Sequence, residues 1–203
     1  MEATHADADD PPVGDAGPPL PRFAVVDIET SGLSTRRHRI LQVAVVSVED
    51  GAVVDEWSSL IRLRWRFQRL GPRRVHGLDR ATLRDAPRQD HVLRELARRL
   101  DGAVFTAHNV SFDWSFLARA AARAGIPLTP VHQLCTLTLS RRLDPDRARS
   151  HRLADVCDRY GVVNDRPHDA MHDARATAAV LPHLLAAHGV RDATDLDRLY
   201  ADR

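Results

Sequence analysis

The sequence of 203 residues contains no lysine, only two cysteines, few aromatic residues and no long hydrophobic run. Cys135 and Cys157 form neither a C-x-x-C pair nor a Cys/His zinc spacing, so we expect reduced thiols that serve as packing residues. The most apolar late stretch, residues 176–187, is too short to span a bilayer and contains Pro182. The first twenty residues lack the basic and apolar regions of a secretory signal, so we expect a cytoplasmic protein with no membrane partner.

The charges are balanced, with 29 basic and 28 acidic residues, which excludes a uniformly polybasic coat for nucleic acid. Electrostatic arguments must therefore rest on local clusters, and every basic residue in them is arginine. A composition that is 43% hydrophobic and 28% charged is typical of one globular domain. We expect a disordered, acidic, proline-rich tail over residues 1–21, one domain over 22–190, and a short C-terminal extension over 191–203.

Hydrophobic patterning predicts an α/β fold with a mixed sheet flanked by helices. Strands are expected at 23–28, 40–48, 52–63 and 103–107. Helices are expected at 91–100, 111–124 with Ser111 as N-cap, 131–142, 153–160 and 170–187, the last kinked near Pro182.

Asp27 and Glu29 lie two residues apart at the end of the first predicted strand. Side chains alternate along a strand, so both carboxylates point to the same face of the sheet. Taken alone, the pair could be an ordinary solvated strand end. It follows a wholly apolar strand, however, at the carboxyl end where α/β sheets place their sites.

Two later segments carry further candidates. Asp113 falls in the first turn of the helix after the strand at 103–107, where an acid also complements the helix dipole. His168 follows Pro167, which discourages helix before it and places the histidine on a loop. Asp173 lies about one turn into the helix that follows. Each segment is weak by itself, but the three occur in one order at plausible spacing.

Together these segments resemble the DEDDh (DnaQ-like) exonuclease superfamily over about residues 22–188. The sequence is most similar to the proofreading epsilon-type subunits of bacterial DNA polymerase III. The matching blocks are Asp27-Ile28-Glu29-Thr30-Ser31-Gly32-Leu33, His108-Asn109-Val110-Ser111-Phe112-Asp113, and His168 with Asp173. Shorter matches are Val75-His76-Gly77-Leu78 and Ser150-His151-Arg152-Leu153-Ala154-Asp155. The resemblance implies an RNase H-like exonuclease fold with a mixed sheet of the five-stranded type.

The resemblance also implies a metal-dependent 3′-to-5′ exonuclease that releases nucleoside 5′-monophosphates. Asp27, Glu29, Asp113 and Asp173 would hold two divalent cations, and their hard oxygen ligands suit Mg2+ or Mn2+. His168 would act as general base. His172 departs from the family pattern, whose spacing selects His168, and the equally unusual Asp169 is interpreted as an N-cap.

The same resemblance assigns the 3′-terminal nucleotide to residues next to the acids, with Leu33 as a wedge under its base. The full predicted set is Thr30, Ser31, Gly32, Leu33, His76, His108, Asn109 and Phe112. Alternating arginines at Arg62, Arg64 and Arg66 either blunt a strand edge or follow phosphates. A second cluster over residues 141–152 is equally ambiguous.

The motifs do not distinguish single-stranded DNA, which we favour, from RNA or oligoribonucleotides. A different interpretation is a polymerase-associated proofreading or nucleic-acid-binding module whose cleavage is incidental or lost. All five catalytic positions are filled, which argues against such a loss. Few residues follow the last predicted helix, which favours a stand-alone nuclease over a polymerase-tethered subunit. An oligomer is possible, although no residue decides it.

Overall fold

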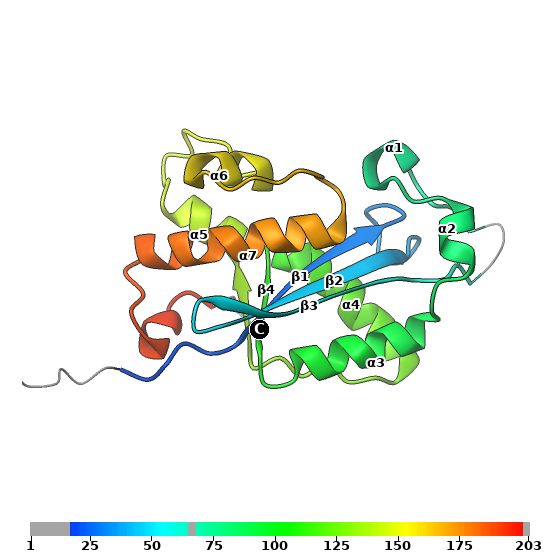
Figure 1. Ribbon diagram of the computed structural model, residues 1–203, viewed down its shortest axis with the longest axis horizontal. Coiled ribbons are helices and arrows are strands. Elements are labelled where there is room, and N and C mark those ends of the chain that lie inside the picture. Colours follow the sequence, from blue (N-terminus) through cyan, green and yellow to red (C-terminus); the bar gives the residue numbers. More distant parts are fainter. Residues whose placement is uncertain (1–16, 65–67, 201–203) are drawn as a thin grey trace, which may run out of the picture.

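The computed structural model describes residues 17–64 and 68–200, which form a mixed five-stranded sheet covered by helices on both faces (Figure 1). The strand order is β3-β2-β1-β4-β5. The strands are β1 (Phe23–Thr30), β2 (Ile40–Glu49), β3 (Ala52–Leu60), β4 (Val104–Ala107) and β5 (His132–Cys135). The helices are α1 (Arg73–His76), α2 (Arg80–Arg84), α3 (Gln89–Leu100), α4 (Val110–Ala124), α5 (Thr136–Arg142), α6 (Leu153–Tyr160), α7 (Ala170–Ala187) and the 3-10 turn η1 (Ala193–Leu196).

Strand β1 lies at the centre of the sheet and is apolar on both faces, as expected for a strand covered by two layers. It pairs antiparallel with β2 and parallel with β4. Phe23 and Val25 belong to the core under α7, whereas Ala24, Val26 and Ile28 belong to the core under α3 and α4. By this alternation Asp27 and Glu29 lie on the α7 face, at the carboxyl end of the strand.

Two element predictions were wrong. The region expected as one helix over 131–142 begins with β5, which pairs parallel with β4, and becomes helical only at Thr136. A strand of four residues is too short to show a period of two, so pairing with β4 decides its conformation. The strand expected over 52–63 ends at Leu60, and the Arg62 backbone N–H then donates to the Pro87 carbonyl oxygen (2.9 Å).

Arg62 and Arg64 therefore lie beyond the sheet edge, while Arg66 falls outside the described residues. Helix α4 begins at Val110 with Asn109 as its N-cap, slightly earlier than the predicted cap at Ser111. The N-cap predicted at Asp169 is confirmed, since its Oδ1 accepts from the backbone N–H groups of Met171 (3.0 Å) and His172 (3.4 Å). Helix α7 continues through Pro182.

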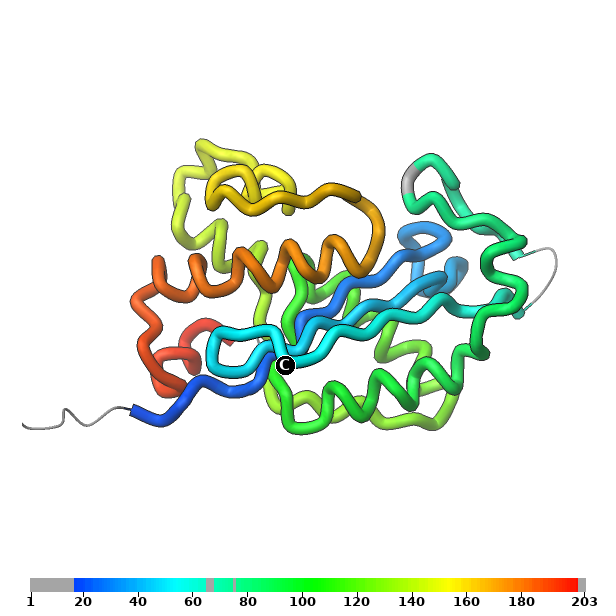
Figure 2. The backbone as a smooth tube through the Cα atoms, viewed as in Figure 1, coloured from blue at the N-terminus to red at the C-terminus, as the bar shows by residue number. Residues whose placement is uncertain are grey.

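The two ends of the described chain lie beside each other (Figure 2). The Ala193 N–H donates to the Pro18 carbonyl oxygen (3.0 Å), and Leu20 packs against the same core as the buried Leu196 and Leu199. Residues 191–200 thus contribute to the core under α7. Most of the predicted tail, residues 1–16, lies outside the described residues. Among the described helices, none has the length and apolar character needed to cross a membrane.

Candidate active site

The two carboxylates of β1 stand where the central strand ends. Glu29 is 8% exposed and Asp27 is partly buried, both on the face covered by α7. The pairing of β1 with β2 shifts register between Glu29 and Thr30, so the ladder becomes irregular directly after the second carboxylate. The chain then leaves the sheet in the loop that connects β1 to β2.

Asp113 comes to this strand end because β4 runs parallel to β1. After β4 the chain turns at Asn109 into α4, which places Asp113 in the first helical turn, 5% exposed. Backbone N–H groups of Asp113 itself and of Ile28 interact with its carboxylate. The Asp113 side chain is therefore anchored to the strand that carries the other two acids.

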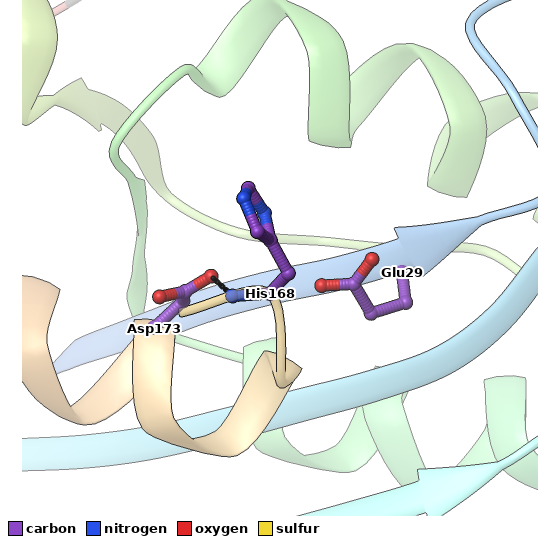
Figure 3. Close-up of side chains that lie close together, drawn as sticks. All are labelled: Glu29, His168 and Asp173. Atoms are coloured by element: carbon purple, nitrogen blue, oxygen red, sulfur yellow. Dashed lines mark hydrogen bonds between the residues drawn. The ribbon is translucent and has the colours of Figure 1, made fainter. Parts of the chain in front are cut away.

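Asp173 and His168 come from the start of α7 and the loop before it (Figure 3). Asp173 is 9% exposed, and both its oxygens accept hydrogen bonds: Oδ1 from the Asn164 side-chain amide (2.6 Å) and Oδ2 from the His168 backbone N–H (2.9 Å). His168 adopts φ 68°, a left-handed conformation that is uncommon for a residue with a side chain. Asp173 thus fixes the backbone of the histidine while the exposed imidazole stays free.

Glu29, His168 and Asp173 lie close together in Figure 3, although they come from segments about 140 residues apart. One potential ligand atom from each lies within 4.8 Å of those of the other two. Asp27 and Asp113 interact electrostatically with the same group, as the pKa of each β1 acid shows. The structure therefore brings together all five residues predicted to be catalytic.

Burial raises the pKa of three carboxyl groups in this site, and neighbouring acids add to the effect for the two on β1. Burial raises the pKa of Glu29 to about 8, reinforced by the charges of Asp173, Asp169 and Asp113. Burial also raises the pKa of Asp113 to about 8, although hydrogen bonds from the backbone N–H groups of Asp113 and Ile28 act in the opposite direction. The pKa of Asp27 lies well above its usual range because of burial, followed by the charges of its four acidic neighbours. Ionised together, these carboxylates need a cation.

The donor set fits hard divalent cations. It consists of carboxylate oxygens and the imidazole of His168. Among the described residues, the potential ligands that lie together include no thiol. The nearby Cys157 is buried, and burial together with Asp173 and Asp158 raises its pKa to about 11, so the thiol stays protonated. A soft metal that prefers thiolate would find no suitable ligand in this part of the described chain.

The loop after β1 carries the residues predicted to hold the terminal nucleotide. Leu33 is 84% exposed. Thr30 Oγ1 donates to the Gly32 carbonyl oxygen (2.9 Å), and the buried Ser31 accepts from the Arg39 N–H (2.9 Å). Gly32 has φ 146°, and a Cβ there would lie 2.6 Å from His38 Nε2, so the position requires glycine.

His76 and His108 are engaged within the protein. His76 Nδ1 accepts from the Leu78 N–H (3.1 Å), so Nε2 carries the proton and donates to the Leu70 carbonyl oxygen (2.9 Å). His108 Nε2 donates to the His151 carbonyl oxygen (2.9 Å), and Nδ1 accepts from Thr136 Oγ1 (3.0 Å). Burial lowers the pKa of His108, in agreement with this neutral tautomer. Both histidines hold loops around the site through both ring nitrogens.

Asn109 and Phe112 mark the entrance to α4. Asn109 is exposed, and its Oδ1 accepts from the Ser111 hydroxyl (3.1 Å). Phe112 is partly buried and packs against Phe116, with ring centroids 5.1 Å apart. Both residues lie near Asp113 in sequence, at the start of α4.

The sequence did not indicate the role of Asn164 or the close approach of the segment before α1 to the loop after β1. Asn164 lies four residues before His168, outside every recognised block, and only the fold shows that its amide reaches Asp173. Gly71, with φ 78°, approaches Ser31 so closely that a Cβ would lie 2.5 Å from the Ser31 carbonyl oxygen. The glycine could have been noticed as a turn residue, but its partner could not.

Comparisons with known proteins agree with this arrangement. Residues 24–181 match the RNase_T exonuclease family. The chain is 32% identical over 178 residues to the PolC-type DNA polymerase III of Staphylococcus saprophyticus, covering 86% of this chain but 12% of that protein. It is thus similar to a small part of the curated relative.

Two solved structures share the fold. Exonuclease X in complex with 5′ overhanging duplex DNA superposes with a TM-score of 0.63 at 26% identity, covering 86% of this chain and 98% of that one. The nuclease domain of 3′hExo, a DEDDh family member bound to rAMP, superposes with a TM-score of 0.70 at 14% identity, covering 85% and 95%. The mixed sheet flanked by helices is therefore an RNase H-like exonuclease fold, as predicted. The chain belongs to the RNase_T exonuclease family.

Proposed function

We propose that this protein is a metal-dependent 3′-to-5′ exonuclease that hydrolyses single-stranded nucleic acid, DNA in preference, and releases nucleoside 5′-monophosphates. The observation that carries the proposal is the convergence of four buried or partly buried acids, from β1, α4 and α7, with one exposed histidine. Repelling carboxylates at this density are unfavourable unless they bind cations. Mg2+ or Mn2+, held by Asp27, Glu29, Asp113 and Asp173, would supply positive charge that stabilises the transferring phosphoryl group.

His168 is proposed as the general base. Its imidazole is exposed beside Glu29 and Asp173, and histidine is the side chain that most often serves as a general base. It would take the proton of the attacking water, and Asp173 would keep its backbone in place through the 2.9 Å hydrogen bond. His172 lies in the first turn of α7, where its N–H is capped by Asp169.

The terminal nucleotide is proposed to lie on the loop after β1. The exposed Leu33 would contact the base, and the chain around Thr30, Ser31 and Gly32 would contact the sugar and phosphate. Stacking contacts of this kind tolerate any base, so little sequence preference is expected. His76, which holds the neighbouring loop, would act by shaping this surface.

RNA is the second candidate substrate, supported by the structural likeness to a DEDDh nuclease domain bound to rAMP. A proofreading role beside a polymerase is the other candidate, supported by the similarity to a PolC-type DNA polymerase III. Neither alternative changes the predicted chemistry at the carboxylates. Each changes only what the surrounding surface binds.

The test is digestion of four matched oligomers, DNA and RNA, each blocked by a phosphate at either the 3′ or the 5′ end. With Mg2+, the wild type should shorten the 5′-blocked oligomers stepwise and leave the 3′-blocked ones largely intact. The oligomer that is shortened faster, DNA or RNA, identifies the preferred substrate. Equal shortening of 3′-blocked and 5′-blocked oligomers would contradict the assigned polarity.

A further inference from the structure

An arginine-rich pocket of about 840 Å³ lies on the face of the sheet opposite Asp27 and Glu29. Its walls are the start of α3, the second half of α4, the loop before β2 and the chain that follows β3. The pocket residues Ile40, Ile61, Phe116 and Ala120 belong to the core under α3 and α4, whereas Asp27 and Glu29 point to the α7 side. The arginines that line it are Arg39, Arg62, Arg64, Arg88, Arg94, Arg119 and Arg123.

The pocket has far more positive charge than its own acids can neutralise. Asp90 is the one acid among the described lining residues, and it already contacts Arg88 Nε (3.3 Å) and an Arg94 guanidinium nitrogen (3.4 Å). Seven guanidinium groups around one carboxylate repel each other unless an anion enters.

Four of these arginines, Arg39, Arg62, Arg119 and Arg123, make no ion pair with a carboxylate of the described residues. Arg119 Nε is buried and has no hydrogen-bond partner within the described chain, which is costly for a donor on a charged group. A planar guanidinium with several fixed donors matches the oxygens of phosphate, so a phosphate ligand would satisfy them.

Two continuous elements connect this pocket to the proposed nucleotide site. The loop between β1 and β2 begins two residues after Glu29 and carries His38 and Arg39, which line the pocket. Its two arms are joined by hydrogen bonds, with Ser31 N–H donating to the Arg39 carbonyl oxygen (2.9 Å) and Arg39 N–H donating to Ser31 Oγ (2.9 Å). A strand that crosses this loop passes from one site to the other.

Helix α4 forms the second connection. Phe112, Phe116, Arg119 and Arg123 are spaced by four, three and four residues, so they lie along one face of the helix. Phe112 flanks the catalytic Asp113, whereas Arg119 and Arg123 line the pocket. Ten residues of helix from Asp113 to Arg123 span about 15 Å, a short reach for a single strand.

We propose that the arginine pocket binds phosphates of the nucleic-acid strand upstream of the 3′ terminus, so that it holds the substrate beyond the nucleotide being removed. This inference rests on the proposed function, whose site it extends. It also resolves the role of Arg62 and Arg64: they lie beyond the end of β3 and do not blunt its edge.

The test measures binding without turnover, in EDTA, of 5′-labelled single-stranded DNA of four and twenty nucleotides by fluorescence anisotropy. The variant R119Q/R123Q removes two unpaired charges from the pocket. The control R84Q/R191Q removes two charges at exposed positions outside it, with side chains 76% and 88% exposed. Thermal melts of both variants verify that they fold.

R119Q/R123Q should weaken binding of the twenty-nucleotide strand at least about tenfold at low salt, with little effect on the four-nucleotide strand. The slope of log Kd against log salt for the long strand should fall by about 1.4, at about 0.7 for each phosphate that the variant no longer neutralises. The control should match the wild type. Equal affinity and equal slope in R119Q/R123Q and the wild type would overturn the proposal.

A second arm separates a nucleic-acid strand from a small anion. Inorganic phosphate or a nucleoside triphosphate should compete with the long strand only at concentrations far above its Kd. The assignment to a strand would be overturned if either small anion bound tightly, if R119Q/R123Q abolished that binding, and if the affinity for DNA did not depend on strand length. Digestion of the same oligomers by the wild type tests the proposed function separately, because the pocket could bind phosphate even in a protein that cleaves nothing.

Discussion

Replacing Glu29 by glutamine is expected to stabilise the metal-free protein at pH 8. Burial and three neighbouring acids raise the pKa of Glu29 from its ordinary 4.5 to about 8. The folded protein therefore keeps this proton to a higher pH than the unfolded chain. The stability that the protonated group allows is complete below pH 4.5 and is lost as the pH rises toward 8.

At about 1.4 kcal/mol for each pH unit between the two pKa values, the loss is on the order of 5 kcal/mol. Glutamine keeps the shape and cannot ionise. E29Q should therefore avoid this loss of folding stability. For a chain of this size, its Tm should exceed that of the wild type by on the order of 10 °C at pH 8 in EDTA, with little difference at pH 4.5.

The assay is thermal unfolding of the wild type and E29Q across pH 4.5 to 8, with EDTA and with Mg2+. Mg2+ should restore the wild type at pH 8 and should stabilise E29Q less, because one ligand is missing. E56Q is the matched control, since Arg175 lowers the pKa of Glu56 through a hydrogen bond and its removal brings no stabilisation. An E29Q protein no more stable than the wild type at pH 8 in EDTA would refute the electrostatic reasoning.

Two further predictions concern residues around Asp173. N164L should weaken the affinity for Mn2+, measured by calorimetry, and activation by Mn2+ about 10-fold to 100-fold, because Asp173 loses a 2.6 Å hydrogen bond. D165N, on the same loop, should leave both unchanged. Unchanged Mn2+ affinity in N164L would count against a positioning role for Asn164. H168A should abolish turnover at pH 7 while H172A retains it, and the reverse result in a steady-state digestion assay would transfer the base to His172.

Local sequence patterns were sufficient for the elements that carry the acids. The apolar run at the start of β1 identifies a strand, and its pleat requires Asp27 and Glu29 to share a face. The alternation of strand and helix predicts α4 and α7 at nearly their observed bounds. His168 and Asp173 were paired through the resemblance to a known family, because His168 lies on the loop before α7 and the helical period does not select it.

Long-range contacts account for what the sequence could not indicate. Strand β5 exists because β4 offers a free edge to His132–Cys135, not because those residues alternate. Asn164 and Asp173 meet through the path of a loop, and the arginines of the pocket come from four separate segments. The sequence pattern showed the cluster at Arg62 and Arg64, but it did not show that arginines of α3 and α4 line the same pocket.

The central claim is that acids from three elements form one metal-dependent hydrolytic site. The most direct measurement is incubation of a 5′-labelled single-stranded DNA oligomer with the wild type and with D27N, in Mg2+ and in EDTA, with products identified by mass spectrometry. We predict stepwise shortening and release of nucleoside 5′-monophosphates only by the wild type in Mg2+. Cleavage by D27N at the wild-type rate, or by the wild type in EDTA, would contradict the account.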